Sequence, residues 1–202
     1  MASSDDWRAH FDALFSADVD PWRFRQRWYE ARKRALTMAC LRRPRYASAF
    51  EPGCANGELS ATLALRCDRL LISDGAATAI ASALERVAGQ SQVSAICAWL
   101  PGDWPDGKFD LIVLSELVYY LDEPDIDLLA SKARASLQPG GDLVACHWRH
   151  PIEGCCLGGD AVHDRLAQKL QLPRVWSLVD ADFRLEIWST DTRTVAKRER
   201  LV

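Results

Sequence analysis

The segment Phe109–Ser115, FDLIVLS, is a near-continuous apolar run of strand length. Such a strand is typical of a parallel sheet whose two faces are both covered by helices. Strand-like and helix-like segments alternate around it, which predicts a doubly wound α/β domain. The expected strands are 46–51, 69–74, 93–98, 109–115, 142–146, 175–179 and 183–188, and the expected intervening helices are 57–65, 76–87, 125–137 and 160–170.

The first 45 residues carry helical patterns of their own. An apolar stripe predicts a short amphipathic helix over 5–15. Asp20-Pro21 has the form of a helix N-cap followed by a first-turn proline, so a second helix is expected over 22–41. We therefore divide the chain into a helical extension or lid (1–45), an α/β domain (46–190) and a tail (191–202).

Bulk composition excludes some partners and favours one compartment. A net charge of −3 over 202 residues gives no general attraction to nucleic acid or to anionic membranes. The sequence contains no 18-residue apolar stretch, so no membrane-spanning helix is expected. The start lacks the basic and apolar blocks of a signal peptide. Seven cysteines, an odd number, fit a reduced compartment. We expect a cytoplasmic protein, whose oligomeric state the sequence does not indicate.

The densest motif is the loop Glu51–Glu58, EPGCANGE, between the first expected strand and its helix. This is the crevice at the carboxyl ends of the strands, where a doubly wound sheet binds nucleotide-like ligands. Gly53 permits a tight turn close to a ligand, and Gly57 permits close packing of the helix against the strand. An acid at Glu51 would repel a pyrophosphate and suits a cationic ligand instead.

Asp74 ends the second expected strand, 21 residues after Gly53. An acid at this place accepts hydrogen bonds from ribose hydroxyls in nucleotide-binding folds. The alternative is that Asp74 only caps the following helix, since aspartate is a common cap. Together with Glu51 and the glycine loop, its position favours the ribose interpretation.

The chain resembles class I S-adenosylmethionine (SAM)-dependent methyltransferases, and most closely the NodS-type enzymes, which N-methylate an amino sugar during nodulation-factor synthesis. The resemblance rests on DPW and WYE near the start, the glycine loop, FDLIVLSELVYYL and CHWRHP. It implies a Rossmann-like, seven-stranded, mostly parallel sheet whose last strand is antiparallel. It also implies SAM as cofactor, S-adenosylhomocysteine as product and a small-molecule, carbohydrate acceptor.

The resemblance also assigns cofactor residues by position. The glycine-loop residues would hold the methionine end, Asp74 and Gly75 the ribose, Ala98 and Trp99 the adenine, and Ser115 the methionine portion. The full set is Glu51, Gly53, Ala55, Gly57, Asp74, Gly75, Ala98, Trp99 and Ser115. Two departures stand out: Ala55 replaces a glycine, and the segment after the third strand offers no acid for the adenine amino group.

Candidates for the transfer step follow the fourth and fifth strands. His147 is the first choice as base or positioning group because its titration range suits proton removal near neutrality, and Tyr120 and Glu116 come next. The alternative for His147 is a buried histidine beneath the next helix. Expected acceptor residues are Trp148, Arg149, Trp22 and Tyr29. Trp22 and Tyr29 lie seven positions apart on one predicted helical face. They could form a lid over the cofactor, or they could anchor that helix to the sheet.

The metal-binding motifs and the basic residues were also considered. Neither C-x-x-C nor H-E-x-x-H occurs, so no metal is expected. A run of basic residues between Arg23 and Arg45 is interpreted as a solvated face rather than an RNA site. Two rival functions remain: a non-catalytic SAM- or nucleotide-binding module, and a nicotinamide-dependent reductase, which Glu51 and the absence of G-x-G-x-x-G disfavour.

Overall fold

The strands of the computed structural model, which describes residues 4–202, form one seven-stranded sheet in the order β3-β2-β1-β4-β5-β7-β6. Their bounds are β1 Ala49–Pro52, β2 Leu70–Asp74, β3 Val93–Cys97, β4 Phe109–Ser115, β5 Leu137–Trp148, β6 Arg174–Val179 and β7 Phe183–Ser189. β7 is antiparallel to both of its neighbours, whereas β1 to β5 pair in parallel. The mostly parallel sheet with its antiparallel final strand is therefore confirmed.

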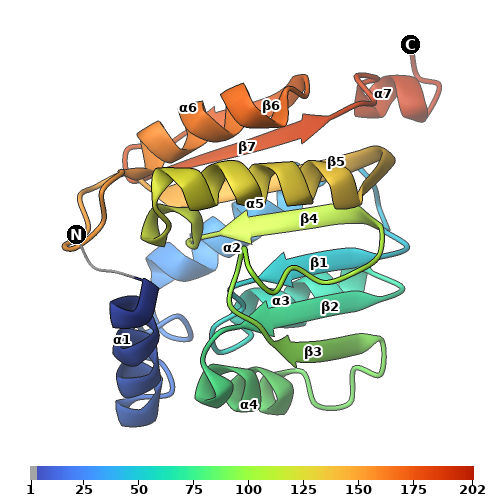
Figure 1. Ribbon diagram of the computed structural model, residues 1–202. Coiled ribbons are helices and arrows are strands. Elements are labelled where there is room, and N and C mark those ends of the chain that lie inside the picture. The colour runs from blue at the N-terminus through green and yellow to red at the C-terminus, as the bar shows by residue number, and fades with distance from the viewer. Residues whose placement is uncertain (1–3) are drawn as a thin grey trace.

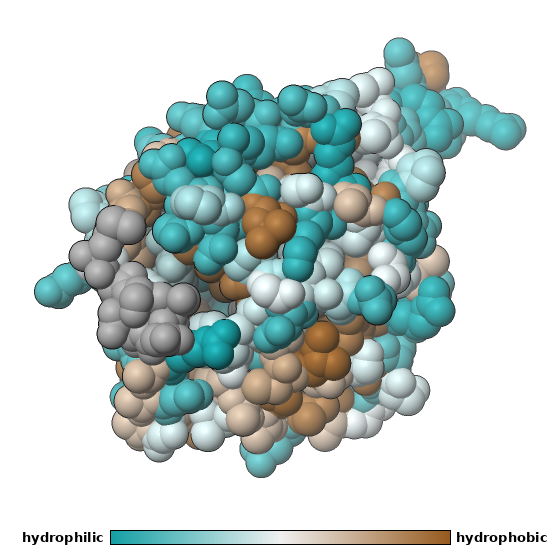
Figure 2. Space-filling model, viewed as in Figure 1, coloured by the Kyte–Doolittle hydropathy of each residue, from teal (hydrophilic) through white to brown (hydrophobic). Residues whose placement is uncertain are grey.

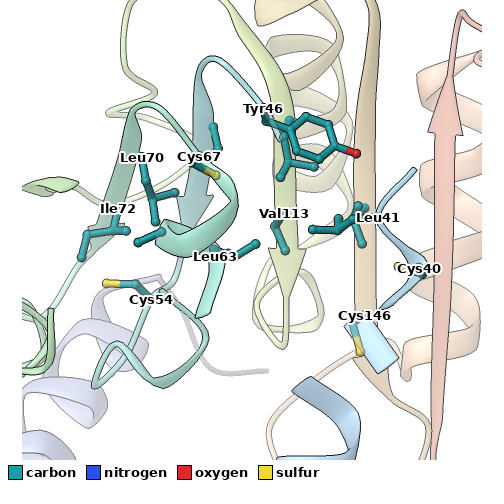
Figure 3. Close-up of a cluster of buried hydrophobic side chains, with 14 of the residues drawn as sticks. Cys40, Leu41, Tyr46, Cys54, Leu63, Cys67, Leu70, Ile72, Val113 and Cys146 are labelled. Atoms are coloured by element: carbon teal, nitrogen blue, oxygen red, sulfur yellow. The ribbon is translucent and has the colours of Figure 1, made fainter. Parts of the chain in front are cut away.

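Helices cover both faces of this sheet (Figure 1). They are α1 Ser4–Ala17, α2 Trp28–Cys40, α3 Glu58–Leu63, α4 Ala77–Arg86, α5 Glu123–Ser136, α6 Gly159–Leu170 and α7 Val195–Arg198, with 3₁₀ turns η1 Ala64–Arg66 and η2 Val118–Tyr120. Leu111 and Val113 of β4 pack into a core with α2 and α3, while Ile112 and Leu114 pack into a second core with α5 and α6. In Figure 3, Val113 lies between Leu63 and Leu41. Burial on both faces explains why the β4 sequence is apolar nearly throughout.

The predicted start of the second helix is wrong: α2 begins at Trp28 rather than at residue 22. The carboxylate of Asp20 does accept backbone N–H groups, from Phe24 at 2.8 Å and Arg25 at 3.1 Å. These bonds close a separate turn, and the Asp20 carboxylate also accepts from the Asn56 side chain at 2.9 Å. The aspartate therefore ties residues 20–25 to the glycine loop instead of capping α2.

Two strand boundaries also differ from the prediction. β5 begins at Leu137 and includes the residues around Gly140 that were expected to form a loop. This extension pairs Leu137 with Phe109 across a register shift, and the Gly140 N–H bonds to the Thr190 hydroxyl at 2.8 Å. Tyr46 forms only an isolated bridge with Cys67, so β1 starts three residues later than predicted.

Figure 2 shows hydrophilic side chains over most of one face, with hydrophobic residues in small, separate patches. Among residues 4–202, no helix is both long and apolar enough to cross a membrane.

Candidate functional site

A cavity of about 610 Å³ lies at the carboxyl ends of β1, β2 and β4. The sheet order reverses between β1 and β4, which is where open α/β sheets bind their ligands. Residues of α1, α2 and the segment between them form the opposite wall, and α1 lies beside this end of the sheet (Figure 1). The volume suits a cofactor-sized ligand.

The glycine loop turns sharply under the cavity. Gly53, Ala55 and Gly57 all have positive φ, at 69°, 49° and 77°. Ala55 therefore adopts the left-handed conformation in place of the glycine usual there. A Cβ on Gly57 would lie 2.9 Å from the Cα of Ala83, so this glycine permits approach of α4, not of a strand as we predicted. Gly57 itself does not line the cavity, whereas Gly53 and Ala55 do.

Glu51 presents a buried carboxylate to the cavity. The residue is 2% exposed, and its Oε2 has no hydrogen-bond partner among residues 4–202. Burial raises the pKa of Glu51 to about 8, and the nearby charge of Asp74 adds to the rise. A buried acid without a counter-ion is costly in its charged form. The site therefore favours a ligand that brings positive charge to this carboxylate.

Asp74 ends β2 and closes the loop. Its Oδ2 accepts the Ala55 N–H and its Oδ1 accepts the Ala76 N–H, both at 3.0 Å. Burial raises the pKa of this carboxyl, while the backbone hydrogen bonds oppose the rise. Ala76 is the N-cap residue of α4, so Asp74 is not the helix cap that we considered as the alternative. Each oxygen keeps a second lone pair for a ligand hydroxyl.

The Trp99 indole packs directly on Gly75. A Cβ built on Gly75 would lie 2.3 Å from the Trp99 ring, and the Arg8 guanidinium sits 5.1 Å from the ring centroid. Asp103 follows the third strand, but its Oδ2 accepts a hydrogen bond from the backbone N–H of Trp99 at 3.0 Å. Trp99 and Ala98 both line the cavity, so a flat aromatic wall stands where the resemblance places adenine.

Gly75→Ala is expected to displace the Trp99 ring, because the added methyl overlaps the indole, and to weaken about tenfold the binding of S-adenosylhomocysteine, the product that the resemblance implies. The matched control is Gly102→Ala, where the nearest heavy atom would be 3.5 Å from the new Cβ. Calorimetric titration of both variants checks the expectation. Equal affinities in the two variants would show that Trp99 does not form a wall of the ligand site.

The other end of the cavity is built around Glu116. This residue follows β4 with a φ of 55°, a left-handed conformation that non-glycine residues rarely adopt. Its Oε1 accepts from the Lys33 ammonium at 2.7 Å, and its Oε2 accepts the Trp148 N–H at 3.0 Å and the Tyr119 hydroxyl. All four side chains line the cavity.

Lys33 is a site residue that the sequence analysis missed. We placed it on a solvated basic face, but it is 6% exposed and also pairs with Glu30 at 3.1 Å. Burial opposes its charge, yet the two glutamates outweigh burial and raise the pKa of Lys33. Arg42 is likewise buried, 3.0 Å from Asp142, with bonds to the carbonyls of Asp191 and Arg193. The solvated-face prediction is therefore wrong for these two positions.

Aromatic side chains form much of the remaining wall. The Tyr29 ring meets Trp148 at 5.4 Å, and its hydroxyl is buried without a partner within the described chain. Trp22 lies before α2 and packs on Phe15 and Phe24, so it does not share a helical face with Tyr29 as predicted. Both nevertheless line the cavity, as does Tyr120, whose ring contacts two aromatic rings of α1, Trp7 and Phe11.

Besides Gly57, two predicted residues do not reach the cavity. His147 is fully buried beneath α6. Its Nε2 accepts a hydrogen bond from the Val118 backbone N–H at 3.2 Å, and its Nδ1 lies 3.1 Å from the His163 Nε2. This is the alternative that we described for it. The Arg149 guanidinium bonds to Asp160 and to the carbonyl of Asp180, which braces the β6–β7 turn. Neither side chain lines the cavity.

The side chains of the described residues give little basis for a metal centre. They contain no group of three or more His, Cys, Asp or Glu placed to hold a metal ion. The carboxylates that line the cavity lie at its two ends, Glu51 and Asp74 at one and Glu116 at the other, and aromatic side chains form much of the wall between them.

The family model described as Nodulation protein S (NodS) matches residues 10–147. The chain belongs to the NodS family. Nodulation protein S of Rhizobium tropici is 32% identical over 131 residues, which cover 62% of this chain and 53% of that protein. The chain thus spans about half the length of this curated relative.

Solved structures extend the likeness to the whole fold. The crystal structure of N-methyltransferase NodS from Bradyrhizobium japonicum WM9 in complex with S-adenosylhomocysteine is 25% identical, with a TM-score of 0.82 over 90% of this chain and 97% of that one. A structure described as a methyltransferase from Pseudomonas syringae is 50% identical, with a TM-score of 0.73 over 81% of this chain and 99% of that one. The predicted class I methyltransferase fold is confirmed.

Proposed function

We propose that this chain is a SAM-dependent methyltransferase that methylates the nitrogen of an amino sugar in a small oligosaccharide. The observation that carries the proposal is the buried Glu51 carboxylate at the cavity, whose Oε2 has no hydrogen-bond partner among residues 7–202. A ligand ammonium supplies the missing counter-charge, whereas the pyrophosphate of a nicotinamide cofactor would be repelled. The S-adenosylhomocysteine complex of a NodS relative supports the same cofactor here.

The residues present fit this cofactor. SAM supplies an electrophilic methyl group on a sulfonium when bound. Glu51, with Gly53, Ala55 and Ser115, is proposed to hold the methionine end, and Asp74 with Gly75 the ribose hydroxyls. The adenine would lie against Ala98 and Trp99 and be held by stacking and backbone groups, which replaces the acid absent after β3. Gly57 acts indirectly by letting α4 approach the loop.

The acceptor is proposed to bind at the Glu116 end of the cavity. Glu116 would accept a hydrogen bond from the acceptor amine and hold its lone pair toward the methyl group, since alignment is the main requirement of an in-line transfer. The Tyr29 hydroxyl, which has no hydrogen-bond partner in the described part of the chain, is free to bond a sugar hydroxyl. Trp148, Tyr120 and Trp22 would form apolar walls. Residues 4–45, the described part of the predicted 1–45 extension, are proposed to act as a lid over the 46–190 domain.

The location and the tail complete the proposal. All seven cysteines are free thiols, which supports a reduced, cytoplasmic setting. Residues 191–202 are proposed as a tail that lies outside the reaction, tied through Arg42 to the segment that follows α2.

The direct test uses methyl-labelled SAM with a glucosamine oligomer and, as control, the fully N-acetylated oligomer. Label is expected in the glucosamine oligomer alone, because only a free amine offers a nitrogen lone pair. Label in both oligomers would indicate O-methylation and contradict the acceptor assignment. S-adenosylhomocysteine binding without labelling of any amine or hydroxyl acceptor would favour the non-catalytic module instead.

A further inference from the structure

Three buried polar side chains form a line beneath the acceptor end of the cavity. Glu186 of β7, His163 of α6 and His147 of β5 all have 0% exposure. The Glu186 Oε2 lies 2.8 Å from the His163 Nδ1, and the His163 Nε2 lies 3.1 Å from the His147 Nδ1. The line ends at the backbone N–H of Val118, 3.2 Å from the His147 Nε2.

The Val118 N–H at one end of the line fixes the direction of every hydrogen bond in it. A backbone N–H can only donate, so the His147 Nε2 accepts and carries no proton. The neutral His147 ring then carries its proton on Nδ1 and donates it to His163, which in turn donates from Nδ1 to Glu186. The Glu186 carboxylate is therefore the terminal acceptor of the line.

The charges agree with this direction. Burial lowers the pKa of His147 well below its usual range, and burial also lowers the pKa of His163. Burial opposes ionisation of Glu186, but hydrogen bonds from His163 and Arg184 outweigh it and lower the pKa of Glu186 to about 2. Two neutral imidazoles thus stand between an anion and a backbone amide.

The amide at the end of the line belongs to the turn that carries the acceptor-side residues. Val118 opens η2, which follows Glu116 and contains Tyr119 and Tyr120. Glu116 itself holds an uncommon left-handed backbone, so the turn needs fixed partners to keep it in place. Lys33 and Trp148 fix the Glu116 carboxylate, and His147 fixes the turn from below.

We propose that Glu186, His163 and His147 form a positioning relay that sets the His147 tautomer and thereby fixes the Glu116–Tyr120 turn for the acceptor. This role rests on the proposed function, since that function makes the turn the acceptor side. His163 and Glu186 are positioning residues that act through His147, and His147 acts through the Val118 amide rather than as a base.

The tautomers are tested first, because they need no acceptor. Nitrogen NMR of the histidine-labelled protein at pH 7 is expected to show His147 and His163 neutral, both with the proton on Nδ1. A proton on the His147 Nε2, or a charged ring at either position, would overturn the relay. This outcome is independent of any activity of the protein.

Two substitutions of His163 then separate positioning from simple packing. The amide of His163→Gln can accept from His147 and donate to Glu186, whereas His163→Leu fills similar space and does neither. We expect His163→Leu to shift the Val118 amide resonance and to lower turnover of the glucosamine oligomer about tenfold or more, as for a misplaced catalytic group. In both variants the affinity for S-adenosylhomocysteine should stay within about twofold of that of the parent chain. His163→Gln should keep most of the turnover, and its Val118 amide resonance should stay at the parent position.

The outcomes are read together with the unfolding midpoints of both variants. Equal losses in His163→Gln and His163→Leu, or an unmoved Val118 resonance in His163→Leu, would overturn the relay. If the parent chain binds S-adenosylhomocysteine but labels no acceptor, the proposed function fails, while the tautomers and the Val118 resonance still decide the relay.

Discussion

Glu51→Gln is expected to lose most of its affinity for S-adenosylhomocysteine and, above pH 8, to be more stable than the parent chain. The affinity falls because the variant removes the carboxylate that would pair with the ligand ammonium, a charge-assisted bond whose loss costs about tenfold or more. The stability rises because the parent carries a buried acid that forms no ion pair with residues 7–202 and whose Oε2 has no hydrogen-bond partner there.

The sign of the stability effect follows from the pKa of Glu51, which burial raises from 4.5 to about 8 in the folded protein. Below pH 4.5 the side chain is protonated in both the folded and the unfolded state, so the acid costs nothing. As the pH rises toward 8, the unfolded chain releases this proton first and the parent loses stability. Above pH 8 the loss is complete, and the glutamine variant should be about 3–5 kcal/mol more stable.

Urea unfolding at pH 5 and pH 8.5 measures this effect, with Glu58→Gln as the matched control. Glu58 is also a buried cavity carboxylate, but it pairs with Arg86 at 2.6 Å and Arg25 at 3.1 Å. Removing its charge should therefore bring no gain in stability at high pH. An unchanged S-adenosylhomocysteine affinity in Glu51→Gln would remove Glu51 from the ligand site, and equal stability at pH 8.5 would show that its charge is not buried.

Lys33→Met is expected to destabilise the folded chain by about 3–5 kcal/mol, the usual cost of removing one partner of a buried ion pair. The variant leaves Glu30 and Glu116 facing each other without the ammonium between them. It also removes the contact that joins α2 to the end of β4, so acceptor turnover should fall together with stability.

The matched control for this variant is Lys169→Met. Lys169 lies 2.7 Å from Asp127, but that pair is partly open to solvent, with 38% and 32% of the side chains accessible. An exposed pair contributes at most about 1 kcal/mol. Urea unfolding near neutral pH compares the two variants. If Lys33→Met costs no more than Lys169→Met, the Glu30–Lys33–Glu116 cluster is not the buried network described above.

The features predicted correctly from sequence are those whose pattern is local. The β4 run indicates burial on both faces because each of its neighbouring side chains enters a different core. The glycine loop is recognised because Gly53 and Gly57 supply the positive φ angles that its turn needs. The places of Glu51 and Asp74 beside the cavity follow from the strand ends, which meet at one edge of a parallel sheet.

The features that were missed depend on contacts across long sequence separations. Lys33 resembles its exposed basic neighbours until Glu116, 83 positions later, is brought against it. The i, i+3 spacing of Glu30 and Lys33 is the one local signal for this pair. His147 follows the predicted fifth strand (142–146) as a catalytic base would, but it lies within β5 and its side chain points under α6 toward His163. The Asp20 carboxylate is shared with Asn56, which moves the start of α2.

Calorimetric titration with S-adenosylhomocysteine tests most directly whether the cavity binds SAM, with NADH as the control ligand. We expect a dissociation constant on the order of micromolar for S-adenosylhomocysteine and no detectable heat with NADH. The S-adenosylhomocysteine affinity should fall in Glu51→Gln. Binding of NADH in place of S-adenosylhomocysteine, or of neither ligand, would contradict the claim.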